Sequence, residues 1–351
     1  MKKEYSILLD LLRLLASMLV FIHHSEQILH VPMVSPFASF GHDAVIFFFI
    51  LSGFVIAFVA NTKEKDINSY AIARLARVFS VSIPSLVLVF VLLALGNVFL
   101  GNNYEFNSIQ TYRTILESLF FLNFSSIGSG GVPTNGPYWS ICYEVFYYLI
   151  FGAAFYLQGL LKFLLVSAFI VLAGVKIIVL LPIWMSGYYL YKQHGRIAEN
   201  VLLGSLLLLV SMSIYFYIRA NNLDDHTFKY VVTILFSSAD EANTYLQWSK
   251  RFVSDYYITI LFMLAMSSLF MLRKIYSKFL MVHEIKIRWL ASFSFSIYLF
   301  HYPILKFLSH ININNYIIMI ISLLTAMFLG GYTEHKKHLF RNVINKLGNI
   351  A

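Results

Sequence analysis

The sequence is short of charge. Only 12% of its 351 residues are Asp, Glu, Lys or Arg, whereas 59% are hydrophobic, and the mean hydropathy is +0.73. A soluble domain is typically about one quarter charged. This deficit argues against a large soluble core and predicts a polytopic membrane protein.

Cysteine is almost absent as well. The single cysteine, Cys142, excludes an internal disulfide and a cysteine-rich metal site. The chain also lacks an HExxH motif, a GxSxG motif, a Walker loop and a GxGxxG stretch before a helix. We therefore expect no metal and none of the enzyme classes that these motifs mark.

What the chain has instead is a series of apolar segments of about 20 residues. With both termini in the cytoplasm, the inner segments hold most of the Lys and Arg residues, as the positive-inside rule requires. These flanks account for the net charge of +9, so we expect no nucleic acid partner. We predict an all-α polytopic membrane protein of about ten transmembrane helices, at residues 6–26, 42–60, 76–100, 138–157, 160–175, 177–192, 201–219, 256–272, 289–308 and 316–333. Residues 1–335 form one predicted domain, and 336–351 a short basic cytoplasmic tail.

The first segment carries polar residues on one face. At 100° per residue, Asp10, Arg13, Ser17 and His24 fall within a sector of about 60°, while His23 lies about 100° away from His24. Ionisable groups inside a span usually face a bundle interior or a water-filled cavity. The stripe is a candidate functional face, although pairing of Asp10 with Arg13 at the inner interface also accounts for those two residues.

Two arginines mark the entry to the third segment. Arg74 and Arg77 are three residues apart and share a helix face, and two planar guanidinium groups on one face suit a phosphate-bearing ligand. Ordinary basic flanking of a span is the alternative explanation.

Later segments add further polar candidates. Glu144 lies in the outer half of the fourth segment and must be paired, solvated or protonated there. In the ninth segment Ser294, Tyr298 and His301 share one helix face. For both sites, a purely structural hydrogen-bond network is the alternative.

Taken in order, five stretches resemble the signatures of acyltransferase family 3, a family of membrane acyltransferases. They are Arg13 to His24, with ten residues between, "GHDAVIFFFILSGFVI", "SYAIARLAR", "GPYWSICYEVFYY" and "FSIYLFHYP". The resemblance implies a multi-pass enzyme of the bacterial inner membrane. Such enzymes take an acetyl or other acyl group from cytoplasmic acyl-CoA and pass it to a sugar hydroxyl of a surface polysaccharide or lipid-linked glycan.

The resemblance also implies roles for individual residues. His24 is the leading catalytic candidate, and Arg13 and Glu144 are further catalytic candidates. Arg74 and Arg77 are candidates for binding the phosphates of coenzyme A. Tyr298 and His301 are substrate-binding candidates. Many members have an acidic residue where this chain has Ile46, so Asp43 or His42 is the candidate replacement. Asp43 is the third substrate-binding candidate.

These expectations leave a rival function open. A transporter or flippase of a glycan precursor would use the same intramembrane polar path, although the chain lacks the recognisable repeats that transporters often have. A non-catalytic subunit is a second rival. The expected partners are membrane lipid, acyl-CoA and a glycan acceptor, and a homodimer is compatible with the sequence.

Overall fold

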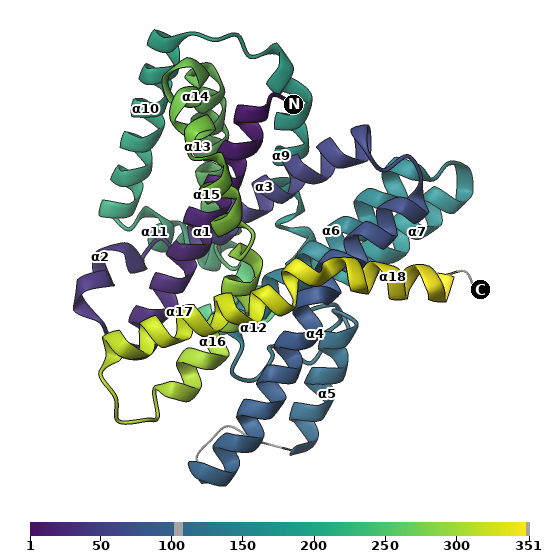
Figure 1. Ribbon diagram of the computed structural model, residues 1–351, viewed down its shortest axis with the longest axis vertical. Helices are drawn as coiled ribbons and strands as arrows, with labels where there is room; N and C mark the ends of the chain where they lie inside the picture. Colours follow the sequence, from purple (N-terminus) through teal and green to yellow (C-terminus); the bar gives the residue numbers. More distant parts are fainter. Residues whose placement is uncertain (102–107, 349–351) are drawn as a thin grey trace. The chain divides into compact units, whose positions relative to one another are not determined.

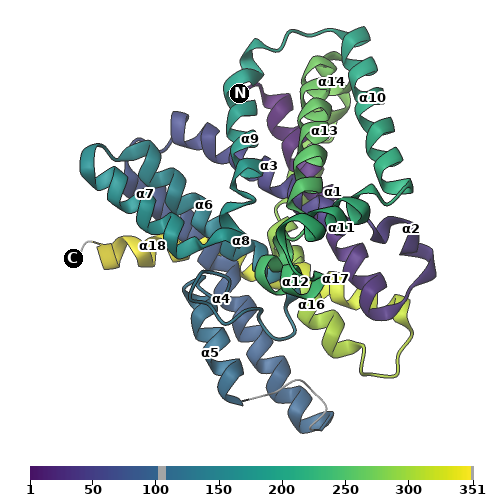
Figure 2. The same ribbon diagram turned by 180° about the vertical axis from the view of Figure 1, so that it is seen from behind.

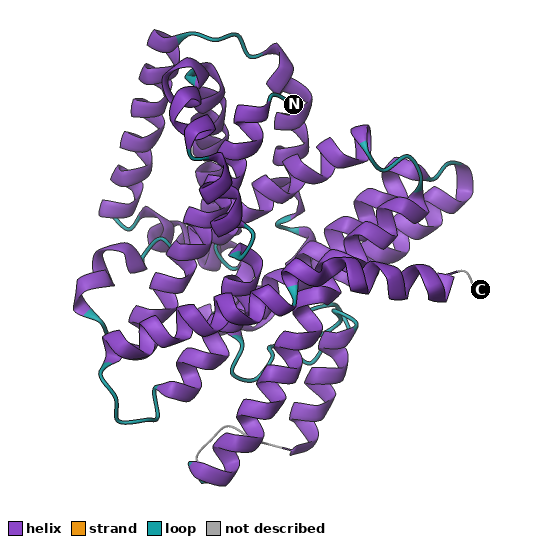
Figure 3. Ribbon diagram, viewed as in Figure 1, coloured by secondary structure: helices purple, strands orange, loops and turns teal. Residues whose placement is uncertain are grey.

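The structure is a computed structural model that describes residues 1–101 and 108–348. Every regular element in these ranges is a helix, and they contain no strand (Figures 1 and 3). The prediction of an all-α protein is confirmed.

The chain divides into two compact units. Unit 1 comprises Met1–Arg13, Val45–Lys63 and Gly174–Arg288, and unit 2 comprises Leu14–Ala44, Glu64–Ala173 and Trp289–Ala351. Two helices are shared between the units, α1 (Lys3–Leu29) and α3 (Gly41–Thr62). The expectation of one domain over residues 1–335 stays a prediction.

Unit 1 is built around the start of α1 and the larger part of α3. Its long helices α10 (Val201–Ala220) and α13 (Phe252–Met271) pack along each other (Figures 1 and 2). Many large apolar side chains of α10 are exposed, as expected for a helix that faces lipid. Besides α10, α13 and its parts of α1 and α3, unit 1 contains α8 (Val175–Ile178), α9 (Leu181–Gln193), α11 (Leu223–Leu235), α12 (Ala239–Leu246), α14 (Arg273–Val282) and most of α15 (Glu284–Ala291).

Two glycines let α3 and α9 approach closely within unit 1. A Cβ atom on Gly53 would lie 1.9 Å from the carbonyl oxygen of Trp184, and one on Gly187 would lie 2.0 Å from that of Ile50. Small residues at such a crossing let two backbones touch, which is a common way to pack helices in membranes. The Trp184 indole N–H also donates to Ser52 Oγ across this contact, at 3.1 Å.

Unit 2 contains the rest of α1 together with the helices that follow Glu64. Helix α16 (Ser294–Leu308) packs on both α4 (Ile67–Phe99) and α17 (Asn315–Tyr332). Helix α6 (Trp139–Tyr156) lies beside α7 (Gly159–Ala173) (Figure 2). Within the segment predicted as a basic tail, Lys337–Gly348 form a helix, α18, which packs on α4. The elements are α2 (Ser35–Ala38), α4 (Ile67–Phe99), α5 (Ser108–Leu119), α6 (Trp139–Tyr156), α7 (Gly159–Ala173), α16 (Ser294–Leu308), α17 (Asn315–Tyr332) and α18 (Lys337–Gly348).

The helices identify a multi-pass membrane protein. Within the described ranges, six helical segments are long and apolar enough to cross a membrane, and a seventh is added if Gly159–Ala173 and Val175–Arg196 form one broken span. The predicted number of ten and the cytoplasmic position of both termini stay predictions. One reason for the difference is α16, whose 15 residues rise about 22 Å, less than the roughly 30 Å of a hydrocarbon core.

Candidate active site

Two histidines from distant parts of the sequence meet in unit 2. Nδ1 of His24, on α1, lies 3.0 Å from Nε2 of His301, on α16. His301 is fully buried, whereas His24 is partly exposed. The predicted catalytic residue and one predicted substrate-binding residue are therefore direct hydrogen-bond partners.

The surroundings of His301 fix where the hydrogens of this pair lie. The carbonyl oxygen of Ile297 can only accept a hydrogen bond, and it is 2.7 Å from Nδ1 of His301. We therefore assign the hydrogen of a neutral His301 to Nδ1, so that its Nε2 accepts a hydrogen bond from Nδ1 of His24. This leaves the lone pair of His24 on Nε2, the atom that can accept a proton or attack a carbonyl.

Aromatic rings border His24. Its ring stacks on that of His301, with centroids 5.2 Å apart, and meets the edge of the Tyr302 ring at 4.9 Å. A Cβ atom on Gly136, which precedes α6, would lie 3.5 Å from the Tyr302 ring. The loop before α6 is thus a neighbour of the aromatic ring that contacts His24. Tyr302 was not among the predicted residues, although it directly follows His301 in the "FSIYLFHYP" stretch.

His23 has a different environment from His24. Its Nδ1 donates to the carbonyl oxygen of Ala38 at 2.5 Å, and a Cβ atom on Gly41 would lie 2.2 Å from its ring. His23 therefore holds the turn that leads into α3. The helical phase that separated the two histidines in the sequence corresponds to two different sets of partners.

The hydroxyl of Tyr298 forms hydrogen bonds within unit 2. Its hydroxyl lies 2.7 Å from Ser140 Oγ and donates to the carbonyl oxygen of Pro137 at 3.1 Å. Asn135 makes a second tie, because its amide donates to the carbonyl oxygen of Leu299 at 3.2 Å. These contacts fasten α16, and with it His301, to the loop before α6.

A second cluster surrounds Arg74 and consists of Glu64, Tyr70, Arg74 and Tyr148. Nη2 of Arg74 donates to Oε1 of Glu64 at 2.5 Å. The guanidinium carbon lies 5.6 Å from the centre of the Tyr70 ring and 5.9 Å from that of Tyr148. The predicted phosphate ligand is therefore held by a carboxylate and two aromatic rings that were not predicted as site residues. Tyr70 and Tyr148 nevertheless lie in the "SYAIARLAR" and "GPYWSICYEVFYY" stretches.

Glu144 and Arg77 belong to the neighbourhood of this cluster. The Tyr148 hydroxyl donates to Glu144, and the charges of both Arg74 and Arg77 act on the same hydroxyl. Tyr148 thus brings three of the predicted site residues, Arg74, Arg77 and Glu144, into one electrostatic group. No sequence signal pointed to Tyr148 as the link.

The remaining predicted residues, Arg13 and Asp43, lie on the two helices that the units share, α1 and α3. Arg13 is 3.4 Å from Asp10, which also accepts a hydrogen bond from Arg288 at 2.7 Å in unit 1. Asp43 is buried in the first turn of α3, where the helix dipole favours a carboxylate. Arg13 belongs to unit 1 and His24 to unit 2, although both are part of α1.

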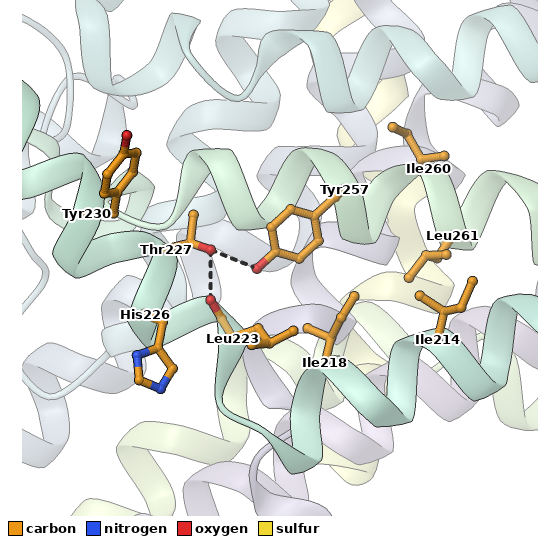
Figure 4. A pocket seen from close by; sticks show the side chains of 9 residues that line it. All are labelled: Ile214, Ile218, Leu223, His226, Thr227, Tyr230, Tyr257, Ile260 and Leu261. Atoms are coloured by element: carbon orange, nitrogen blue, oxygen red, sulfur yellow. Dashed lines mark hydrogen bonds between the residues drawn. The ribbon is translucent and has the colours of Figure 1, made fainter.

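A groove in unit 1 has a different character. It has a volume of about 580 Å³ and is lined by Ile214, Ile218, Leu223, His226, Thr227, Tyr230, Tyr257, Ile260 and Leu261 (Figure 4). Thr227 Oγ1 donates to the carbonyl oxygen of Leu223 and lies 3.3 Å from the Tyr257 hydroxyl. Five of the lining residues are aliphatic, and His226 and Tyr230 complete the lining. In the part of the chain that the structure describes, no group of three or more His, Cys, Asp or Glu residues could hold a metal ion.

A family model described as an acyltransferase domain matches residues 7–333, which include His24, Arg74, Glu144 and His301. No curated protein and no solved structure matches the chain.

Proposed function

This chain belongs to the acyltransferase family that its motifs resemble, and on that premise we propose that it O-acylates a sugar. The donor is acetyl-CoA or a similar acyl-CoA in the cytoplasm. The acceptor is a hydroxyl of a surface polysaccharide or a lipid-linked glycan, and the enzyme acts in a bacterial inner membrane. The observation that carries this proposal is the hydrogen bond between His24 and His301.

The hydrogen-bonded pair of His24 and His301 supports general-base catalysis by His24. Nε2 of His24 takes the proton of the acceptor hydroxyl as the oxygen attacks the thioester carbonyl and forms the new C–O bond. Collapse of the tetrahedral intermediate breaks the C–S bond, and the departing thiolate of coenzyme A takes the proton back from His24. In the charged state His24 donates from Nδ1 to the neutral His301, which stabilises the imidazolium. Transfer through an acyl group on His24 Nε2 is the alternative route.

The other candidates fall into supporting roles. We assign the phosphates of coenzyme A to Arg74 and Arg77, because guanidinium groups bind phosphate oxygens through parallel N–H donors. Tyr298 is proposed to position His301 through its bonds to Ser140 and Pro137. Arg13, Asp43 and Glu144 remain candidates for contacts with the substrates.

The test is transfer of a labelled acetyl group from acetyl-CoA by purified protein in liposomes. We expect His24→Ala to abolish transfer, because no other base occupies its place. His23→Ala should retain transfer while lowering thermal stability, because His23 holds the turn before α3. Full activity in His24→Ala would refute the assignment of the base, and movement of glycan without donor would favour the flippase.

The donor site has its own test. Replacing Arg74 or Arg77 with Ala should raise the KM for acetyl-CoA while affecting the KM for the acceptor little. An unchanged donor KM in both variants would remove the phosphate role.

A further inference from the structure

The ion pair between Arg74 and Glu64 has only one of the two parallel hydrogen bonds that a guanidinium group and a carboxylate can form. Arg74 Nε and Nη2 lie on the same edge of the guanidinium group and can bind two oxygens of one anion in parallel. Glu64 Oε1 takes Nη2 alone. Arg74 Nε and Glu64 Oε2 are both buried without a hydrogen-bond partner among the described residues. A donor and an acceptor that could pair are thus both left unsatisfied, which is rare for buried groups.

The rest of the cluster keeps Arg74 in place independently of Glu64. The rings of Tyr70 and Tyr148 flank the guanidinium group, and the Tyr70 hydroxyl donates to the carbonyl oxygen of Tyr148 at 3.0 Å. Such ring contacts attract a cation. Arg74 would therefore keep its position if the Glu64 carboxylate left it.

Glu64, in contrast, is free to move without unwinding a helix. It precedes α4, outside any helix, and its side chain makes its one described hydrogen bond to Arg74. The start of α4 is fixed by other residues, because Asp66 and Ser69 form a reciprocal capping box. Rotation of the Glu64 side chain away from Arg74 breaks one hydrogen bond and leaves the helix end intact.

We propose that Glu64 occupies Arg74 in the place of a donor phosphate and is displaced when acyl-CoA binds. This inference rests on the proposed function. A phosphate group offers several oxygens, so it can engage Nε and Nη2 together and complete the fork that one carboxylate oxygen leaves open. Arg77, one turn further along α4, adds positive charge for the same ligand. Glu64 is then an internal competitor that sets how tightly the donor binds.

The experiment measures coenzyme A binding to the full-length protein in detergent by isothermal titration calorimetry. Glu64→Gln removes the competing charge, so its Kd for coenzyme A should be about tenfold lower than that of the wild type, the equivalent of one charge-assisted hydrogen bond. Pantetheine, which lacks the phosphates, should bind wild type and variant equally. Tightening that extends to pantetheine would overturn the proposal.

A matched control separates this effect from a general change of charge. Glu117, on α5, is also paired with an arginine, with Oε1 2.8 Å from Arg113 Nε. Glu117→Gln changes the net charge by the same amount and should leave the Kd for coenzyme A unchanged. An equal decrease in both variants would attribute the effect to net charge and refute the role of Glu64.

A second variant covers the case in which Glu64→Gln fails to fold, as judged by size-exclusion chromatography. Glu64→Asp keeps the charge but shortens the reach to Arg74, and it should also lower the Kd. If the wild type binds no coenzyme A, the proposed function and this inference both fail. If the wild type binds it and neither variant binds more tightly, the inference alone fails.

Discussion

At the scale of single residues, the hydrogen bond to His301 sets which nitrogen of His24 carries the lone pair. The Ile297 carbonyl fixes the hydrogen of His301, and His301 in turn fixes the hydrogen of His24. If His24 is the proposed base, His301 acts through it, and we therefore propose that His301 is a positioning residue.

This role predicts a difference between two substitutions. In the wild type the ring centroids of Phe21 and His301 are 5.8 Å apart. His301→Phe keeps a ring beside Phe21 but removes the hydrogen-bond acceptor for His24 Nδ1–H. We expect kcat to fall about 100-fold, at the lower end of the effect of a general base, with little change in the KM for acetyl-CoA. His301→Gln offers a carbonyl oxygen to the same N–H and should recover part of the loss.

Steady-state transfer in liposomes, measured from pH 5 to pH 9, checks this prediction. A structural role alone would lower both variants equally and leave the shape of the pH profile of kcat unchanged. Equal activity of the Phe and Gln variants would therefore contradict the positioning role.

At the scale of elements, the contact between α3 and α9 depends on two residues without side chains. Carbonyl oxygens lie where Cβ atoms of Gly53 and Gly187 would be. Because backbone cannot move aside as a flexible side chain can, even one methyl group must push the helices apart.

We predict that Gly53→Ala and Gly187→Ala destabilise the protein. Overpacking of this kind typically costs about 1–3 kcal/mol, so the thermal midpoint in detergent should fall. Gly331→Ala is the control, because a Cβ atom on this helical glycine meets open space. It should be neutral or slightly stabilising, since Gly lowers helix stability relative to Ala. An unchanged midpoint in both α3–α9 variants would mean that the helices separate without cost.

At the scale of the whole molecule, ion pairs connect distant ends of unit 1. Glu199 accepts from Lys2 at 3.0 Å and from Arg273 at 2.7 Å, and Glu284 pairs with Lys3 at 2.6 Å and with Arg288 at 3.0 Å. The bonds of Lys2 and Lys3 attach the N-terminal end of the chain to residues nearly 200 or more positions away in the sequence. The two carboxylates, Glu199 and Glu284, lie outside the long apolar segments.

The ion pairs predict a pH dependence. The hydrogen bond from Lys2, followed by that from Arg273, lowers the pKa of Glu199, and the bond from Lys3, with that from Arg288, lowers the pKa of Glu284. A carboxylate whose folded-state pKa is depressed stabilises the fold above its unfolded pKa, and this stabilisation is lost as pH falls through the folded value. Thermal stability at low salt should therefore decrease as the pH drops below about 4.5.

The double variant Glu199→Gln/Glu284→Gln is the control for this effect. Its thermal midpoint should depend less on pH in that range, and salt should reduce the difference, because exposed ion pairs are screened. Identical pH profiles of variant and wild type would assign the acid sensitivity to other carboxylates.

The sequence by itself determined the class of the protein and much of the element order. Low charge and long apolar segments predicted an all-α membrane protein because backbone groups in lipid must be satisfied within a helix. Local periodicity also separated His24 from His23, since both lie on one helix whose phase is fixed. The family followed from short motifs, which are local patterns.

Only the tertiary structure decided which of these residues meet. His24 and His301 are 277 positions apart, and nothing in either local pattern specifies their contact or the hydrogens that it fixes. The partners of Arg74 were hidden for the same reason, because Glu64 lies in a connection without periodicity and Tyr148 looked like one more aromatic residue of a span. Helical phase determines the face on which a side chain lies, whereas the packing of helices distant in the sequence determines what that face touches.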